Sequence, residues 1–512
     1  MNLCSSLEEL SISHPEKTAI IAGNTRISYG DLLDKVNRLA GNLSRLGLKK
    51  GDRLAFLMPN CPEFVISFYA AMKLGVITVS LNVMFKKDEV DFIANDAEPV
   101  ALIAHENLLP LVSDMDRVRK GRMRVILVGG RDTPEKDMRS FQSLFEEAPV
   151  QKPTGVVAPE DEAVIAYTSG TTGFPKGAVH THQNILAHLQ GICNHLGFHS
   201  GDVVLAALPF SQLVAFLIHA GVTLHVGGTV VILEKFETAN FLNAVRKEHV
   251  TFFAGVPTIY HMIRAASKDL DVDLRSLRFG LCAGSPLSLE LREQFENKFR
   301  FRIIHCYGMT EISLIAACED PTCPPKGISV GHVLPYIRLN VVRADGSRAE
   351  KGEVGEIHIG AERTLNRYWN APSETEETIR DGWFATGDMG RFDEQDHLYI
   401  VDRKKDMIIR GGFNIYPAEI ERVLAQDPRV QEVAVIGVPH ERLGELPKAF
   451  VVLKDGATAT KKELLELSRE KLANFKALEE VEFVHQGFFH RNALGKIVKS
   501  ELRAALKRAG GT

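Results

Sequence analysis

Hydrophobic and polar positions alternate along the first half of the chain in the pattern of repeated helices and strands. Residues 31–46 place leucine, valine and alanine three and four positions apart, which predicts an amphipathic helix ending at Gly47. Apolar runs at 53–58 and 163–168 predict strands, and residues 62–74 predict another helix. This alternation predicts an α/β fold with mostly parallel sheets, whose ligand sites lie at the carboxyl ends of the strands.

One long stretch, residues 203–233, contains no Asp, Glu, Lys or Arg. Its length could cross a bilayer, but Pro209, several polar side chains and a glycine pair at 227–228 interrupt it. We predict a buried strand, a helix over 212–224, a glycine turn and a second buried strand at 229–233. The sequence therefore predicts no transmembrane segment.

The pattern changes near residue 340. Short strands joined by polar turns at 343–360 and 390–402 predict a small β section. The charged run 402–406 then precedes a mixture of helices and strands. We predict a large N-terminal lobe of several subdomains, residues 1–402, and a small mobile α+β C-terminal lobe, residues 403–512.

Composition narrows the class of protein. The 512 residues include 61 basic and 65 acidic side chains, a net charge of −4 that gives no reason to expect nucleic acid as a partner. The seven cysteines form no C-x-x-C pair, and the first residues resemble no signal peptide. We therefore expect reduced thiols and a cytoplasmic protein.

The strongest local motif follows the predicted strand 163–168 and reads Tyr167-Thr168-Ser169-Gly170-Thr171-Thr172-Gly173-Phe174-Pro175-Lys176-Gly177. Its glycines let backbone N–H groups approach phosphate oxygens, its hydroxyls add donors, and its lysine supplies positive charge. The spacing differs from a Walker A loop. The motif indicates nucleotide phosphate binding without a P-loop fold, the alternative being a flexible linker.

Three further segments are weak signals taken singly. Residues 305–311 end a predicted strand with Tyr307, which as an exposed side chain could stack on a base, and with Thr310 and Glu311, whose oxygens suit Mg²⁺. Residues 382–388 offer an aspartate for ribose hydroxyls, and residues 491–497 carry one lysine. Taken singly, each is better explained as an ordinary turn or a solvated charge.

In this order the segments resemble the adenylate-forming superfamily, which includes acyl-CoA synthetases, luciferases and adenylation domains. The resemblance also covers 352–357 and 411–421, and so extends over essentially the whole chain. The nearest branch looks like the fatty-acyl and coumarate-type CoA ligases. The resemblance implies Mg²⁺ as cofactor and ATP, CoA and a small carboxylic acid as substrates, and it leaves a homodimer open.

The resemblance implies these ATP-binding residues: Thr168, Ser169, Gly170, Thr171, Thr172, Gly173, Lys176, Gly284, Ser285, Tyr307, Gly308, Asp388 and Arg403. Residues 168–176 would embrace the β- and γ-phosphates, and Tyr307 would stack on adenine. Asp388 and Arg403 would bind the ribose hydroxyls.

The catalytic residues implied are Lys496, Thr310 and Glu311, with Thr310 on the α-phosphate and Glu311 holding Mg²⁺. An ionised carboxylate would attack the α-phosphate to give acyl-AMP, and the CoA thiol would then expel AMP. Lys405 falls at the family's hinge, and Gly411 and Gly412 would line the pantetheine tunnel. Rotation of the C-terminal lobe would exchange Lys496 for this glycine segment.

For the acyl pocket we expect Gln212, Ala254, Gly255 and Ala283, between walls formed by 203–233 and 251–260. Gln212 stands where the family often has histidine, and Ala283 where it often has glycine. These walls contain no Lys or Arg to pair a second carboxylate. We predict a medium- or long-chain fatty acid. An aryl or alicyclic acid, a carrier protein as acceptor, and a binding protein without turnover are the alternatives.

Overall fold

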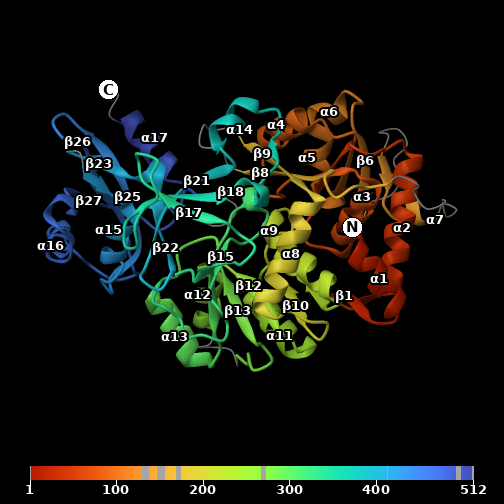
Figure 1. The fold of residues 1–512 in the computed structure, drawn as a ribbon, viewed down its shortest axis with the longest axis horizontal. Helices are drawn as coiled ribbons and strands as arrows, with labels where there is room; N and C mark the ends of the chain where they lie inside the picture. The colour runs from red at the N-terminus through yellow and green to blue at the C-terminus, as the bar shows by residue number, and fades with distance from the viewer. Residues whose placement is uncertain are drawn as a thin grey trace. The chain divides into compact units, whose positions relative to one another are not determined.

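The computed structural model describes residues 2–129, 138–146, 156–168, 175–266, 272–411, 413–491 and 497–509. The chain divides into two compact units (Figure 1). Unit 1 comprises Met1–Arg338 and Ile359–Phe384, and unit 2 comprises Leu339–His358 and Ala385–Thr512. The boundary that we predicted between residues 402 and 403 falls inside unit 2, so the lobes 1–402 and 403–512 remain a prediction.

The first large sheet of unit 1 has the strand order β16-β15-β14-β13-β12-β10-β11-β1-β2. Its strands are β1 (Thr18–Ala22), β2 (Thr25–Ser28), β10 (Val203–Ala206), β11 (Thr229–Ile232), β12 (Phe252–Gly255), β13 (Phe279–Cys282), β14 (Ile303–Tyr307), β15 (Ala317–Cys318) and β16 (His332–Val333). The strands from β1 to β14 in this order pair in parallel. Helices α11 (Thr238–Glu248), α12 (Pro257–Ala266) and α13 (Leu289–Phe299) contribute to its hydrophobic core.

The second large sheet has the order β19-β9-β8-β4-β3-β5-β6-β7. Its strands are β3 (Arg53–Leu57), β4 (Ile77–Ser80), β5 (Ala101–His105), β6 (Arg124–Val128), β7 (Met138–Ser140), β8 (Glu162–Thr168), β9 (Lys176–Thr181) and β19 (Arg367–Tyr368). Only the β8–β9 and β9–β19 pairings of this sheet are antiparallel within the described residues. The two sheets confirm the predicted α/β fold with mostly parallel strands.

Local signals set the ends of the predicted helices. Helix α3 (Pro62–Leu74) begins with proline at its first position and ends at Gly75 with φ of +68°. Helix α2 (Tyr29–Arg45) begins where the Asp31 N–H donates to the Ser28 hydroxyl at 3.1 Å. The remaining helices of unit 1 are α1 (Ser5–Ser13), α4 (Lys87–Ala97), α5 (Leu109–Asp114), α6 (Asp116–Arg119), α7 (Ser143–Glu146), α8 (His182–Leu196), α9 (Leu213–Phe216), α10 (Val222–Val226) and α14 (Pro372–Thr378).

The charge-free stretch forms the elements that we predicted. It runs through β10, then through α9, a π-helical turn (Leu217–Gly221) and α10, and ends in β11. The two strands lie side by side in parallel and are largely buried, because the sheet is covered on both faces. In the described part of the chain, no helix is long and apolar enough to cross a membrane.

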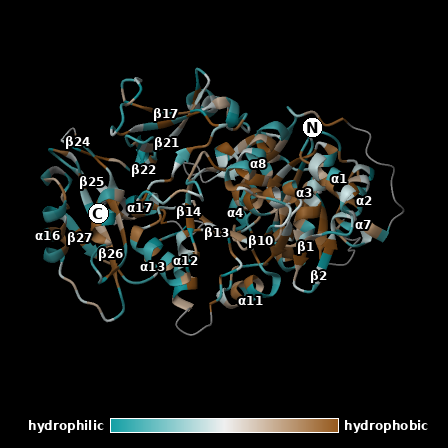
Figure 2. Ribbon diagram, turned by 60° about the horizontal axis from the view of Figure 1, so that its bottom comes forward, coloured by the Kyte–Doolittle hydropathy of each residue, from teal (hydrophilic) through white to brown (hydrophobic). Residues whose placement is uncertain are grey.

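Unit 2 contains most of a small sheet and a separate α+β part. The small sheet consists of β17 (Leu339–Val342), β18 (Gly355–Gly360), β20 (Ile379–Arg380), β21 (Trp383–Phe392) and β22 (Leu398–Arg403), and the unit boundaries fall inside β18 and β21. The α+β part consists of β23 (Ile408–Arg410), β24 (Phe413–Ile415), α15 (Pro417–Leu424), β25 (Val430–His440), β26 (Gly444–Leu453), α16 (Lys461–Lys471), β27 (Glu480–Phe483) and α17 (Lys499–Ala509). Helix α16 is coloured mostly hydrophilic and α3 mostly hydrophobic (Figure 2), in keeping with their exposed and buried positions.

One expectation about the cysteines is wrong. Cys306 of β14 stands opposite Cys318 of β15, and the two form a disulfide bond. Antiparallel pairing of the two strands brings the thiols together, and a separation of 12 residues gives no local signal of this. The other cysteines are free.

Candidate active site

The predicted phosphate loop joins two paired strands. Thr168 is the last residue of β8, Lys176 is the first of β9, and the two residues pair across the antiparallel ladder. Gly177 follows, where a Cβ would come within 2.6 Å of the Ile165 side chain, so the close packing here requires glycine. The structure thus holds both ends of the loop together. Its predicted ligands Ser169, Gly170, Thr171, Thr172 and Gly173 lie outside the described residues.

Glu311 lies beside the start of this loop. It occupies a 3₁₀ turn, η4 (Thr310–Ile312), just after β14. Its Oε1 accepts hydrogen bonds from the Thr168 hydroxyl at 3.5 Å and the Tyr368 hydroxyl at 3.4 Å. The backbone N–H of Leu365 donates to the Glu311 carbonyl at 2.6 Å. The structure therefore brings together Thr168 and Glu311, two residues that the sequence predicted for one site.

The donor set around Glu311 fits Mg²⁺, because carboxylate and hydroxyl oxygens are hard ligands. Among the described residues, no three His, Cys, Asp or Glu side chains are grouped to hold a metal ion. Mg²⁺ commonly keeps several waters and binds through one or two carboxylates together with substrate phosphates. Glu311 suits this mode of binding.

Tyr368 is a site residue that the sequence analysis missed. It ends β19 and pairs with Ala178 of β9, which places its ring centroid 5.8 Å from the Lys176 Nζ. Burial, and then the Glu311 carboxylate, raise the pKa of Tyr368 well above its ordinary value, so its hydroxyl stays a donor. No local pattern marks this tyrosine, because β19 has only two residues and depends on a strand far earlier in the chain.

The carboxyl ends of three parallel strands gather other predicted residues. Gly255 at the end of β12 stands opposite Cys282 of β13, which stands opposite His305 of β14. The Ala283 N–H donates to the Gly255 carbonyl at 3.3 Å. The predicted residues that follow or end these strands are Ala254, Gly255, Ala283, Gly284, Ser285 and Tyr307. This arrangement is typical of ligand sites in α/β folds.

Tyr307 is less exposed than we expected. It retains 8% of its surface, and its hydroxyl donates to the Met309 sulfur at 4.0 Å. The cause is β15, which pairs with β14 and places Ala317 opposite Tyr307. Gly308 follows, where a Cβ would lie 2.0 Å from the Leu314 carbonyl oxygen, so no larger residue fits. The expectation of an exposed tyrosine is therefore wrong, and stacking on adenine remains a prediction.

Two buried histidines pack against residues of this site. His180 of β9 forms a hydrogen bond through Nδ1 with the Ser313 hydroxyl at 2.8 Å, just after the turn that carries Glu311. His219, in the π-helical turn, lies with Nε2 3.3 Å from both the N and the O of Ala254. Burial lowers the pKa of His180 to about 3 and that of His219 to about 4, so both side chains are neutral.

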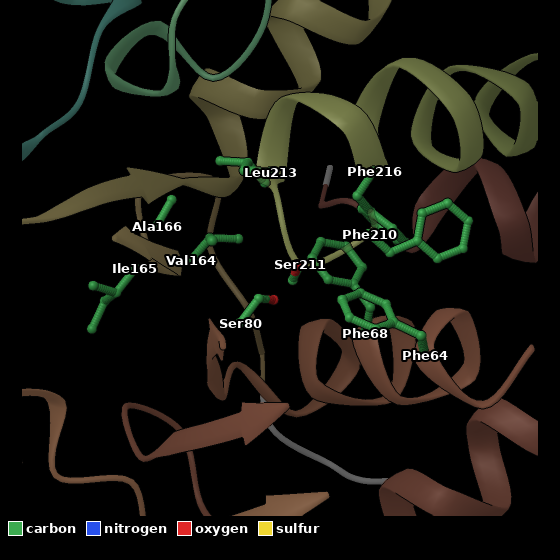
Figure 3. Close-up of a pocket in the computed structure, with 10 residues that line it drawn as sticks. All are labelled: Phe64, Phe68, Ser80, Val164, Ile165, Ala166, Phe210, Ser211, Leu213 and Phe216. Carbon is green, nitrogen blue, oxygen red and sulfur yellow. The ribbon is translucent and has the colours of Figure 1, made fainter. Parts of the chain in front are cut away.

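A small cavity lies beside the start of α9 (Figure 3). Figure 3 shows phenylalanine side chains on one side, strand β8 on the other, and the hydroxyls of Ser80 and Ser211 between them. The lining residues, none of which is charged, are Phe64, Phe68, Ser80, Val164, Ile165, Ala166, Phe210, Ser211, Leu213 and Phe216. Residues of the predicted wall 203–233 line this cavity together with residues of α3, β4 and β8. The wall 251–260 does not line it and remains a prediction for the acyl pocket. Gln212 lies between two lining residues at the start of α9.

In unit 2, Asp388 and Arg403 stand opposite each other in β21 and β22. The Arg403 Nε lies 2.6 Å from Asp388 Oδ1, with 43% of the arginine side chain exposed against 6% of the aspartate. The Asp388 N–H donates to the Thr386 hydroxyl at 3.1 Å. The structure therefore pairs the two residues that we predicted for the ribose hydroxyls.

The predicted hinge and tunnel residues follow in unit 2. Lys405 lies in a 3₁₀ turn, η6 (Lys404–Asp406), directly after β22, where burial lowers its pKa. Gly411 adopts a φ of +56° at the end of β23, and its N–H donates to the Leu443 carbonyl at 2.8 Å. Gly412 and Lys496 lie outside the described residues. In the sequence Lys496 directly precedes Ile497, which forms an isolated β-bridge with Arg491.

Residues 7–369 match the family of AMP-binding enzymes, and residues 419–496 match the AMP-binding enzyme C-terminal domain. The chain belongs to the family of AMP-binding enzymes.

Three similar proteins narrow the class. A long-chain-fatty-acid–CoA ligase of Bacillus subtilis is 32% identical, with 98% of this chain and 94% of that protein covered. A feruloyl-CoA synthase of an Amycolatopsis species is 34% identical, with 96% of each covered. The structure of o-succinylbenzoate coenzyme A synthetase (MenE) from B. subtilis with ATP and magnesium ion has a TM-score of 0.83 and 27% identity, covering 97% of this chain and 99% of that one.

Within that family the protein is an AMP-forming acid–thiol ligase, an ATP-dependent acid–CoA ligase.

Proposed function

We propose that the protein joins a medium- or long-chain fatty acid to CoA through an acyl-AMP intermediate. The observation that carries this substrate class is the absence of charged side chains from the predicted wall 203–233 and from the lining of the small cavity beside α9, a cavity that itself has room for only about one water. An apolar acyl body is stabilised by such walls, and a second carboxylate would be buried without a partner.

In the first half-reaction, a carboxylate oxygen of the acid forms a bond to the α-phosphorus of ATP, and the bond to the pyrophosphate oxygen breaks. The acid is already ionised, so the step needs no general base, only alignment and stabilisation of negative charge. We assign contacts with the β- and γ-phosphates to residues 168–176, including Ser169, Gly170, Thr171, Thr172, Gly173 and Lys176. Thr310 would contact the α-phosphate, and Lys496 would stabilise the charge that develops there.

Glu311 would hold Mg²⁺, which when bound neutralises phosphate charge. Thr168 and Tyr368 orient the Glu311 carboxylate by donating to its Oε1. Tyr307 and Gly308 would contact adenine, with Gly284 and Ser285 beside them. Asp388 and Arg403 would accept from and donate to the ribose hydroxyls.

In the second half-reaction, the CoA thiol loses its proton, its sulfur bonds to the acyl carbonyl carbon, and AMP leaves with the bonding electrons. Gly411 and Gly412 would line the path of the pantetheine arm, and Lys405 would be the hinge about which residues 403–512 turn between the two steps. Gln212, Ala254, Gly255 and Ala283 would lie near the acyl group.

A panel of acids tests the substrate class. Pyrophosphate release is measured with medium- and long-chain fatty acids, ferulate and succinate, with and without CoA, and thioester formation is followed separately. Fatty acids should give the highest kcat/KM and CoA thioester, and succinate should give no turnover. A preference for succinate, or pyrophosphate release without thioester, would contradict the proposal.

An aryl acid is the second candidate, because the cavity is lined by four phenylalanines and the feruloyl-CoA synthase is 34% identical. A higher kcat/KM for ferulate than for any fatty acid would favour it.

The division of labour between the two steps has its own test. Lys496→Ala should lose acyl-AMP formation but still make thioester from supplied acyl-AMP. Lys462→Ala, an exposed lysine of unit 2, is the matched control and should keep both activities. Equal loss of both half-reactions in Lys496→Ala would show that the two steps do not use different residues.

A further inference from the structure

Lys176 of β9 lies near Glu374 of α14, an acidic residue to which the proposed mechanism assigns no role. Glu374 of α14 lies with Oε1 3.8 Å from the Lys176 Nζ, and the two side chains are 38% and 22% exposed. The Glu374 carboxylate therefore lies beside the amino group to which we assign contacts with the ATP phosphates. We propose that Glu374 competes with the phosphates of ATP and pyrophosphate for Lys176, and so sets the affinity of the site for both ligands. This inference rests on the proposed function of Lys176.

Hydrogen bonds between the elements that carry Glu374 and Lys176 help to position the two side chains. The Tyr368 N–H donates to the Thr375 hydroxyl at 3.0 Å, and that hydroxyl donates to the Ala371 carbonyl at 2.8 Å. These bonds fix the first turn of α14 to β19. Because β19 pairs in turn with β9, Glu374 and Lys176 are carried by elements that are joined by hydrogen bonds.

Apolar packing reinforces this arrangement. Tyr368, Leu365 and Ala178 form one buried cluster with Phe384, and Ala371 and Ile379, on either side of α14, pack against it. The Tyr368 ring also lies 5.8 Å from the Lys176 Nζ, at a cation–π distance. The lysine therefore lies within reach of both an aromatic ring and a carboxylate.

The charge pattern decides the direction of the effect. A triphosphate that approaches Lys176 must displace Glu374 or accept a negative charge a few ångströms away. Either cost weakens the binding of ATP and of pyrophosphate alike, because both place phosphate oxygens at the lysine. Weaker pyrophosphate binding would favour release of this product after the first half-reaction.

The test compares single charge removals on one helix. Glu374→Gln should lower the KM for MgATP, and the inhibition constant for pyrophosphate, by about three- to fivefold, the effect of one partly exposed ion pair. Glu377→Gln is the matched control, since this residue is an exposed glutamate of the same helix that forms no ion pair with Lys176 among the described residues. Its constants should equal those of the wild type. Glu374→Asp keeps the charge and should lie close to the wild type.

The dependence of these constants on salt concentration distinguishes an electrostatic role of Glu374 from a merely structural one. The difference between Glu374→Gln and the wild type should shrink as KCl is raised to about 1 M, where the Debye length is near 3 Å. Constants for Glu374→Gln that match those of Glu377→Gln would overturn the proposal. A raised KM would overturn it too, and would indicate that Glu374 binds the metal or the nucleotide. If the proposed function itself failed, the wild type would release no pyrophosphate with any acid.

Discussion

Two arginine–carboxylate pairs, one in each unit, differ in how far the protein encloses them. In unit 1, Arg292 of α13 donates to Glu319 at 2.9 Å, and the two side chains are 2% and 5% exposed. In unit 2, Arg403 pairs with Asp388 at 2.6 Å, but 43% of the arginine is exposed. The first pair is enclosed by protein, whereas the arginine of the second is open to solvent.

The partners of the buried pair explain its role. Arg292 also donates to the Ile303 carbonyl at 2.7 Å, and Glu319 accepts the His305 N–H at 2.8 Å. Both contacts hold β14, the strand that ends at Tyr307. Thus a fully enclosed pair fixes the strand beneath the site, and a half-exposed pair is available to bind. The family resemblance singles out Asp388 and Arg403, but no local pattern shows which pair is buried, because each consists of an arginine and an acid that are distant along the chain.

Breaking the buried pair should give the largest effect. Arg292→Met leaves Glu319 buried without its cation, which costs about 3–5 kcal/mol of unfolding free energy. Thermal and urea unfolding should both show the loss. Arg292→Met combined with Glu319→Leu should recover part of it, since no charge is then left unpaired. A single variant as stable as the wild type would contradict the distinction between the two pairs.

A buried histidine, like the buried ion pair, should make stability depend on its surroundings, and in this case on pH. His188 of α8 lies with Nε2 2.9 Å from the Arg363 carbonyl, and burial lowers its pKa from 6.5 to about 4. The unfolded chain therefore takes up a proton first as pH falls. Stability from neutral His188 is complete above pH 6.5 and is lost down to about pH 4, at about 1.4 kcal/mol per pH unit.

His188→Gln should therefore flatten the fall of unfolding free energy between pH 6.5 and 4, measured by urea unfolding at steps of half a pH unit. His14→Gln changes an exposed histidine and should keep the slope of the wild type. The slope should not vanish, because the buried His180 and His219 also have lowered pKa values. An unchanged slope in His188→Gln would show that His188 does not contribute to the acid sensitivity.

Removing the half-exposed arginine should reduce activity more than stability. Arg403→Ala removes a charge-assisted hydrogen bond worth about 1.5–3 kcal/mol, which corresponds to about 10- to 100-fold in kcat/KM for ATP. The melting temperature should fall too, because Asp388 is only 6% exposed and loses its cation, but it should fall by less than in Arg292→Met, since solvent reaches the arginine side of this pair. A large loss of stability with unchanged kcat/KM would assign Arg403 to packing.

Features set by a local stretch of sequence could be predicted, and features set by contacts between distant segments could not. Helix α3 is predictable because its initial proline and terminal glycine are local signals. The phosphate loop is predictable because glycine, hydroxyl and lysine side chains are concentrated in a single segment. Tyr368 and Glu374 are not, because their contacts depend on a two-residue strand pairing with β9. The low exposure of Tyr307 likewise depends on β15, a neighbour formed after the turn.

The smallest predicted effect comes from Lys351, a cation as exposed as Arg403 but paired with an exposed rather than a buried carboxylate. Lys351 pairs with Asp396 at 2.8 Å, and 43% of the lysine is exposed, the same fraction as for Arg403. Its partner Asp396 is 68% exposed, however, whereas Asp388 is 6% exposed. A buried carboxylate fixes the cation that faces it, but an exposed one is screened by water. Lys351→Ala should therefore change the unfolding free energy by less than about 0.5 kcal/mol and leave kcat/KM for ATP unchanged. A loss of activity as large as in Arg403→Ala would mean that partner burial does not mark the ligand site, and the comparison would fail.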